Sequence, residues 1–256
     1  MSPRRPPRAW IGPVQPVDPE ELVGPRGLIE EVLRGEDEEH AADPDAGFFW
    51  SLLSPARQAR ILSVIEARLA SVTIVLDRLV DPHNTAAILR TAEGLGLARA
   101  HVVPHDPGDD GRAHRRVTQD AQKWIDVERH RSGAACAKEL AKRGFEVWAG
   151  HLGGSVPLYS ELPADRPVAL LFGNEHEGPS AETIAACKGT FRIPMAGFTQ
   201  SFNVSVAAGI ALAHLAQARR AQLGAAGDLS PQERVLLRER FTLLAARLAR
   251  RMKQRR

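Results

Sequence analysis

Residues 168–178 read VALLFGNEHEG, an apolar run that leads straight into a polar loop with glycine at each end. Five consecutive apolar residues are typical of a strand buried on both faces, the usual state of a strand in a parallel sheet. Gly173 permits close approach of the backbone to a ligand, and Gly178 suits a turn with positive φ. The loop matches neither GxGxxG nor a P-loop, so it indicates neither a dinucleotide nor a nucleoside-triphosphate site.

Short apolar runs alternate with helical patterns on both sides of this strand. Strands are expected at 72–76, 101–103, 146–150, 168–172 and 191–194, and helices at 82–96, 132–143, 180–187 and 203–223. Buried strands separated by helices predict an α/β fold with a mostly parallel sheet flanked by helices.

Two further helices are expected outside this alternation. Ser54-Pro55 predicts the start of an amphipathic helix over 55–69, with Leu62, Ile65 and Leu69 as its apolar residues. Ser230-Pro231 starts a final helix, with Glu233 at the spacing of a capping box and an apolar face that includes Phe241.

The chain divides by composition into three parts. Residues 1–53 form an arm rich in proline and acidic residues, expected to be largely irregular and mobile, with one short helix near 28–33. Residues 54–223 form the α/β domain. Residues 224–256 form a basic C-terminal helix.

The overall composition is that of an ordinary globular chain, with 43% hydrophobic and 25% charged residues among 256. No apolar run approaches the ~20 residues that span a bilayer, and the N-terminus lacks the apolar segment of a secretory signal. Two cysteines cannot build a disulfide framework. We therefore expect a cytoplasmic protein without a membrane span.

Charge is concentrated at the C-terminus. Residues 219–256 carry 11 Lys/Arg against 3 Asp/Glu, a net +8, whereas the whole chain has only +3. This favours a polyanionic partner such as nucleic acid, and the alternative is a solvated arginine-rich helix face. The basic residues expected to contact the phosphates of such a partner are Arg112, Arg115, Arg116, Lys123, Arg250 and Arg251.

Polar residues interrupt the α/β pattern where strands end, which is where ligands bind in open α/β sheets. Asp81-Pro82-His83-Asn84 precedes a helix that carries Arg90. Asn84 either caps that helix or serves a site. Arg90 lies among apolar residues, so it is expected to pair with a carboxylate such as Glu175 or to face an anionic ligand.

A second loop, 193–203, leads into a helix whose start holds Ser201, Asn203 and Ser205. Three small polar residues exceed what capping requires, and N–H groups at a helix start can bind a carboxylate or phosphate. The histidines and cysteines are scattered without metal-ligand spacing, so no metal site is expected.

Together, three segments resemble the motifs of the SpoU/TrmH branch of the knotted SPOUT methyltransferases. They are PHNTAAILRTAEGLG at 82–96, LFGNEHEG at 171–178 and IPMAGFTQSFNVSVA at 193–207, in the same order and spacing. The resemblance covers about residues 54–250 and is closest to the tRNA guanosine-18 2′-O-methyltransferase group. That group is matched also by the helix before the first strand, by AQKW at 121–124 and by the basic C-terminal helix.

The resemblance implies an S-adenosylmethionine enzyme that methylates a ribose 2′-hydroxyl of tRNA or rRNA, works as a homodimer and has a C-terminal trefoil knot. The family's catalytic set maps onto Asn84, Arg90, Glu175, Ser201 and Asn203. Its cofactor-binding positions map onto Gly150, His151, Leu152, Gly173, Ile193 and Phe202. Phe202 stands where the family usually has leucine, and the arm at 1–50 has no counterpart in the compact members.

Three other functions are open to a chain with these motifs. An rRNA methyltransferase of the same family shares all of them. A knotted RNA-binding protein without activity is disfavoured by the intact catalytic set, and a nucleotide-dependent dehydrogenase by the missing glycine fingerprint.

Overall fold

The computed structural model describes residues 46–105 and 123–254. They belong to two compact units, one spanning Ile61–Arg238 and the other combining residues from Met1–Arg60 and Glu239–Arg256. The strands are β1 (Val72–Asp77), β2 (Arg99–Val103), β3 (Asp126–Arg129), β4 (Glu146–Gly150), β5 (Val156–Pro157), β6 (Val168–Phe172) and β7 (Gly189–Arg192). The helices are α2 (Ala46–Ser51), α3 (Pro55–Glu66), α4 (Pro82–Gly94), α6 (Gly133–Lys142), α7 (Leu158–Glu161), α8 (Ala181–Ala186), α9 (Val204–Leu223) and α10 (Pro231–Gln254).

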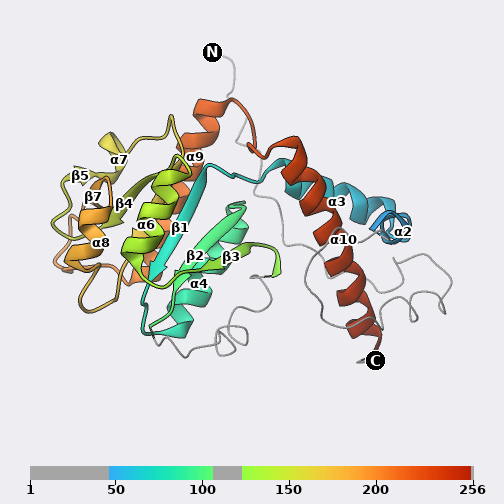
Figure 1. Cartoon of the computed structure of the whole chain (residues 1–256), viewed down its shortest axis with the longest axis horizontal. Coiled ribbons are helices and arrows are strands. Elements are labelled where there is room, and N and C mark those ends of the chain that lie inside the picture. The colour runs from blue at the N-terminus through green and yellow to red at the C-terminus, as the bar shows by residue number, and fades with distance from the viewer. Residues whose placement is uncertain (1–45, 106–122, 255–256) are drawn as a thin grey trace, which may run out of the picture. The chain divides into compact units, whose positions relative to one another are not determined.

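The larger unit is built on one sheet with the strand order β3-β2-β1-β6-β4-β7-β5 (Figure 1). Each pairing in this sheet is parallel. The middle strands β1 and β6 are buried along their whole length. The predicted parallel α/β sheet is therefore confirmed.

Helices cover both faces of the sheet, so alternate residues of the middle strands enter two different cores. Ile74, Leu76 and Leu170 pack with residues of α4 and α9. Val75 and Leu171 pack on the other face with residues of α6, and Ile184 of α8 adds to that core (Figure 1). A buried strand needs apolar residues on both faces, which explains the uninterrupted run at 168–172.

Most predicted elements are present, with small shifts. β4 and β6 have the expected bounds, while β7 begins and ends two residues earlier than predicted. The helix expected over 55–69 ends at Glu66, and its buried residues are Ile61 and Ile65, whereas Leu62 is exposed. The strands β3 and β5 and the short helix α7 were not predicted.

Two predicted caps are confirmed. The Ser54 Oγ accepts from the Arg57 N–H at the start of α3. At α10 the Ser230 Oγ accepts from the Glu233 N–H, while the Glu233 carboxylate accepts from the Ser230 N–H in return. Within the described residues, no helix has the length and apolar character needed to cross a bilayer.

The smaller unit shows that the expected irregular arm ends in a helix. Residues 46–51 form α2, and the Phe49 ring is 2% exposed because it packs with Leu52, Leu243 and Ala246. Phe241 of α10 is buried, as expected. The remainder of the arm, including the helix expected near 28–33, lies outside the described residues.

Candidate active site

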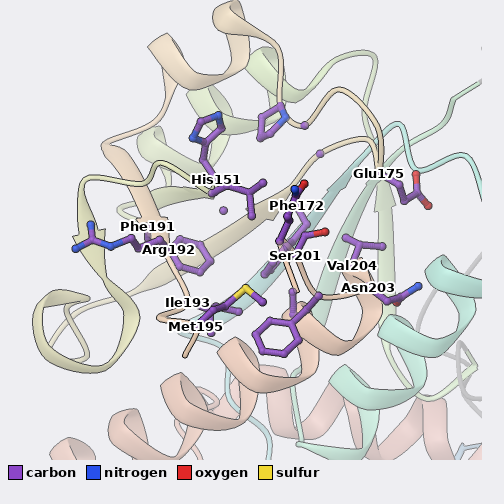
Figure 2. Close-up of a pocket in the computed structure, with 18 of the residues that line it drawn as sticks. His151, Phe172, Glu175, Phe191, Arg192, Ile193, Met195, Ser201, Asn203 and Val204 are labelled. Atoms are coloured by element: carbon purple, nitrogen blue, oxygen red, sulfur yellow. The ribbon is translucent and has the colours of Figure 1, made fainter. Parts of the chain in front are cut away.

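A cavity of about 1000 Å³ opens at the carboxyl ends of β4, β6 and β7. The loops that follow these three strands line it, together with the first turn of α9. Figure 2 shows Glu175 and Asn203 at one side of this cavity and His151, Phe191 and Arg192 at the other. The site therefore lies where parallel α/β sheets bind their ligands.

A chain of three polar side chains stands at the cavity. The Asn203 Nδ2 donates to the Asn84 Oδ1 at 3.2 Å, and the Asn84 Nδ2 donates to the Glu175 Oε1 at 3.0 Å. An ionised carboxylate only accepts, so Asn84 must present its NH₂ to Glu175 and its oxygen to Asn203. The sequence predicted these three residues as site residues, and the structure brings them together.

Glu175 joins the loop after β6 to the loop after β1. Its carboxylate also accepts from the backbone N–H groups of Val80, at 2.8 Å, and Asp81, at 3.3 Å. Partial burial by itself raises the pKa of Glu175, but the hydrogen bonds from Val80, Asn84 and Asp81 outweigh it and hold that pKa below its ordinary value. The hydrogen bonds therefore favour the ionised form of Glu175, which joins the two loops as an acceptor.

Asn84 is not a helix cap, in contrast to one of its two predicted roles. α4 begins at Pro82, and Asp81 caps it by accepting from the His83 N–H at 2.8 Å. The side chain of Asn84, which is 9% exposed, is thus available to the cluster. Asn203 does cap its helix, since its Oδ1 accepts from the Ser205 N–H at 2.8 Å.

Two residues that sequence reasoning missed also shape these loops. The Asn174 Oδ1 accepts from the N–H groups of His176 and Glu177, and its Nδ2 donates to the Arg78 carbonyl oxygen. Arg78 has a positive φ of 59°, a conformation that costs energy for a side chain other than glycine. An asparagine directly after Gly173 is a turn signal that identifies Asn174 in the sequence.

Arg90 lies apart from the cluster. It is exposed on α4 and does not line the cavity. The Glu175 carboxylate instead accepts hydrogen bonds from Val80, Asp81 and Asn84. No ion pair between Arg90 and Glu175 is present in the described structure. Six residues turn an α-helix by about 600°, which leaves Arg90 about 120° away from the direction of Asn84. The expected Arg90–Glu175 pair is therefore not formed within one chain.

The predicted cofactor residues converge on the cavity. All six of them line it, as does Ser201, and they are Gly150, His151, Leu152, Gly173, Ile193 and Phe202. Arg192, which was not predicted, braces the loop after β4 because its Nη1 donates to the Gly154 carbonyl oxygen. Gly173 does permit a close approach, but to the chain itself, since a Cβ there would lie 2.2 Å from the Pro179 nitrogen. Gly178 has a φ of 71°, as predicted.

The lining fits a small organic cofactor of mixed polarity. Apolar side chains such as Ile193, Met195 and Phe202 share it with backbone groups of three loops. Binding sites for such molecules are mostly apolar with a few placed polar groups, and their volumes reach about 1000 Å³. S-adenosylmethionine, with an apolar adenine face and polar ends, suits this lining.

The residues expected to bind RNA are mostly outside the described structure. Arg112, Arg115 and Arg116 lie outside the described residues. Arg250 and Arg251 belong to α10, but their side chains are not described. Lys123 is half-buried. RNA contact by these residues stays a prediction.

A parallel sheet whose loops enclose a cavity of mixed polarity beside a fixed amide–carboxylate cluster defines an α/β enzyme that binds a small organic cofactor. Residues 71–213 match the model of the SpoU rRNA Methylase family, and the chain belongs to that family. The resemblance inferred from the motifs is thus confirmed, together with the enzyme class, an RNA methyltransferase, and the cofactor, S-adenosylmethionine.

Three relatives are particularly informative. The tRNA (guanosine(18)-2′-O)-methyltransferase of Thermus thermophilus is 36% identical over 169 residues, which cover 66% of this chain and 86% of the relative. The structure of the Aquifex aeolicus TrmH/SpoU tRNA modifying enzyme has a TM-score of 0.64 at 29% identity and covers 73% of this chain and 95% of its own. An AdoMet-bound rRNA methyltransferase from Sinorhizobium meliloti has a TM-score of 0.53 at 29% identity, covering 61% and 59%.

Proposed function

We propose that the chain methylates the ribose 2′-hydroxyl of guanosine 18 in tRNA, with S-adenosylmethionine as methyl donor. The observation that carries this proposal is the Asn203–Asn84–Glu175 chain beside the cavity of a SpoU-family protein. The names of the relatives from Thermus thermophilus and Aquifex aeolicus support tRNA as the substrate.

Bound S-adenosylmethionine supplies an electrophilic methyl group, so the protein has to position and activate the ribose oxygen. The Asn203 amide and the Ser201 hydroxyl both belong to residues of the cavity lining and are suited to orient the ribose. Asn84 fixes the orientation of Asn203, and Glu175 fixes that of Asn84. Asn84 and Glu175 thus act as positioning residues.

Arg90 binds the RNA phosphate next to the methylated ribose and stabilises the developing alkoxide. A role as general base is disfavoured, because removing a proton from an arginine with a pKa above 12 costs roughly 7 kcal/mol at neutral pH. Its exposure on α4 suits contact with a large polyanion.

The active form in this proposal is a homodimer. Members of the family complete their site across a dimer interface, and here Arg90 lies outside the cavity of its own chain. Exposed apolar side chains surround the cavity and the start of α9, with Leu152 69%, Phe198 108% and Val206 49% exposed. Sedimentation at micromolar concentration should show a species of twice 27.9 kDa, and a monomer alone would contradict the dimer.

Two further features of the proposal come from the family resemblance and the cysteines. The family resemblance implies a C-terminal trefoil knot with the cofactor in it. The protein works in the cytoplasm, in agreement with two cysteines that are both free thiols.

The second candidate is methylation of rRNA. The Sinorhizobium meliloti neighbour is named an rRNA methyltransferase, and the same motifs serve both substrates. The shared fold does not discriminate between them, because function resides in the site and its partner.

Methylation with labelled cofactor tests both candidates in one experiment. The full chain is incubated with bulk tRNA and, separately, with rRNA, and the 2′-O-methyl position is mapped. A 2′-O-methylguanosine at position 18 of tRNA is expected. Labelled rRNA alone supports the second candidate, and cofactor binding without transfer to either RNA indicates the non-catalytic RNA-binding protein.

A further inference from the structure

Two histidines and a cysteine meet on the α6 face of the sheet. His101 lies in β2, His130 follows β3, and Cys136 lies in α6. One ligand atom of each residue lies within 4.8 Å of those of the other two. None of the three lines the cofactor cavity.

The fold assembles this cluster from residues that are distant in the sequence. The parallel register pairs His101 with Glu128. His130 therefore lies beside the end of β2, and its backbone N–H donates to the Val102 carbonyl oxygen at 3.0 Å. Ser132 then caps α6, which presents Cys136 from its first turns. We expected no metal site because the histidines and cysteines are far apart in the sequence. The fold brings these three together.

All three side chains are withdrawn from solvent. The His101 side chain is 1% exposed, that of His130 is 8% exposed, and Cys136 is 0% exposed. The His101 Nδ1 faces the His130 ring, whereas its Nε2 has no hydrogen-bond partner within the described part of the chain.

The spacing of the polar atoms is close to that of a tetrahedral metal centre. The His101 Nδ1 and the His130 Nε2 are 3.0 Å apart, whereas two zinc-bound nitrogens at 2.0–2.1 Å would be separated by about 3.3 Å. The Glu128 Oε2 lies 3.5 Å from the first nitrogen and 3.9 Å from the second, which places a carboxylate at the fourth side. The Cys136 sulfur lies within 4.8 Å of a ring nitrogen of each histidine, so the thiol and the carboxylate have to move towards the two nitrogens to complete a coordination shell.

A carboxylate also lies near the second ring nitrogen of one histidine. The Glu139 Oε2 is 3.5 Å from the His130 Nδ1, which is the ring nitrogen that faces away from His101. Histidine ligands commonly donate their second N–H to a carboxylate, and Glu139 lies close enough to take that role after a small movement.

Carboxylates and guanidiniums surround the cluster. Within the described residues, Arg99 pairs with Asp126 and Glu128, and Arg143 pairs with Glu128 and Glu139. Glu128 thus brings a carboxylate, a ligand that Zn²⁺ also accepts, close to the two imidazoles and the thiol.

We propose that His101, His130 and Cys136 bind a zinc-class divalent cation, with Glu128 at the fourth position and Glu139 orienting His130. Two imidazole nitrogens and a thiolate favour Zn²⁺ over Mg²⁺ or Ca²⁺, which prefer oxygen ligands. The sulfur–metal bond forms as the Cys136 proton leaves for solvent.

Cobalt substitution tests the proposal on the full chain without an affinity tag. The protein is stripped with a chelator, the chelator is removed, and Co²⁺ is added in steps. We expect one equivalent to bind, with visible bands of tetrahedral cobalt and a thiolate-to-cobalt charge-transfer band in the near ultraviolet. Cys136→Ala should lose the charge-transfer band, and His130→Gln should weaken binding at least tenfold.

Cys187→Ala is the matched control, because Cys187 is the other thiol of the chain and packs against the same core. It should keep the full spectrum. Zinc at about 100 times its Kd should raise the Tm of the wild type and of Cys187→Ala by about 5–10 °C, and leave that of Cys136→Ala unchanged.

Three results would overturn the proposal: no cobalt spectrum in the wild type, a charge-transfer band that persists in Cys136→Ala, or a zinc-induced Tm rise that persists in that variant. The cluster would then be a hydrogen-bonded histidine pair beside a core thiol. This test does not depend on the methylation assay, because it reads metal binding at a separate site.

Discussion

At Glu175, one side-chain amide and two backbone N–H groups converge on a single carboxylate. The contact joins the loops after β1 and β6, two neighbouring strands. Hydrogen bonds to a charged acceptor are stronger than neutral ones, although partial exposure weakens them here. The contribution of Glu175 to stability therefore depends on pH.

Glu175→Gln should lower the free energy of unfolding by about 1–2 kcal/mol at pH 7, because an NH₂ group would face the donors that the carboxylate now accepts. The folded-state pKa of Glu175 is depressed, so its stabilisation is present above the ordinary value of 4.5 and is lost as the pH falls through the folded-state pKa. The difference between variant and wild type should thus shrink towards about pH 4. Urea unfolding at both pH values measures it.

Glu177→Gln provides the matched control, since Glu177 is exposed in the same loop and lines the same cavity. It should change stability by less than about 0.5 kcal/mol at either pH. An equal loss in both variants would show that the three hydrogen bonds of Glu175 do not matter for stability.

Asn203 has two tasks that substitution separates. Asn203→Ser keeps an oxygen that can cap α9 but removes the Nδ2 donor, whereas Asn203→Ala removes both. Both variants should lose at least 100-fold in kcat, and only Asn203→Ala should lose about 1 kcal/mol of stability. Single-turnover methylation, thermal unfolding and calorimetry with the cofactor separate these effects, and near wild-type kcat in Asn203→Ser would remove the amide from the proposed mechanism.

The sequence predicts site residues best where a polar residue lies in the loop after the carboxyl end of a strand. Glu175 and Asn203 lie in loops that follow the carboxyl ends of β6 and β7, so their presence at one cavity could be expected from topology. The positions of Asn84 and Arg90 could not, because the direction of each side chain depends on where α4 begins. Asp81 rather than Asn84 caps that helix, so the Asn84 side chain is available to donate to Glu175.

At the scale of elements, buried strands were predicted better than edge strands. The run 168–172 has only one interpretation once it is buried on both faces, and β6 has the predicted bounds. β3 reads DVER and lies at an edge, where charged residues prevent pairing with other chains, so it carries no apolar signal. β5 is two residues long and includes Pro157, which the opposite edge tolerates.

The loop between β6 and α8 packs closely on itself at Gly173, which leaves no room for a side chain. A Cβ at this position would lie 2.2 Å from the Pro179 nitrogen and 2.4 Å from the Gly178 carbonyl carbon, both backbone atoms. Gly173→Ala should therefore displace the loop, cost about 1–3 kcal/mol and weaken cofactor binding at least tenfold. Calorimetry with S-adenosylmethionine and thermal unfolding give the two quantities.

Gly197→Ala is the control for this prediction. Gly197 also lines the cavity, but a Cβ there meets nothing within 4 Å. Its substitution should leave the Kd for S-adenosylmethionine within a factor of about two of the wild-type value. The free energy of unfolding should stay close to that of the wild type. Equal losses in the two variants would mean that the cavity tolerates no added methyl group, irrespective of the backbone contact of Gly173.

At the scale of the whole molecule, charge and chemistry are separated along the chain. The residues of the cavity and of the amide–carboxylate cluster lie between positions 84 and 207. The net +8 lies in residues 219–256. Neither the basic tail nor the basic residues near 112–131 form a base-reading motif, so we expect them to determine affinity for RNA more than the choice of nucleotide.

Removal of residues 250–256 tests this division. The deletion takes away five positive charges, those of Arg250, Arg251, Lys253, Arg255 and Arg256. Each phosphate contact contributes about 0.7–0.9 to the slope of log K against log salt, so the slope should become shallower by up to about four. tRNA binding measured across a salt series should show this change. The affinity for S-adenosylmethionine and the position of the methyl group should stay the same, because the cavity is built from other residues.

An unchanged slope in a truncated protein with intact circular dichroism would assign these arginines to a solvated helix face. A shifted methylation position would give the tail a part in choosing the nucleotide.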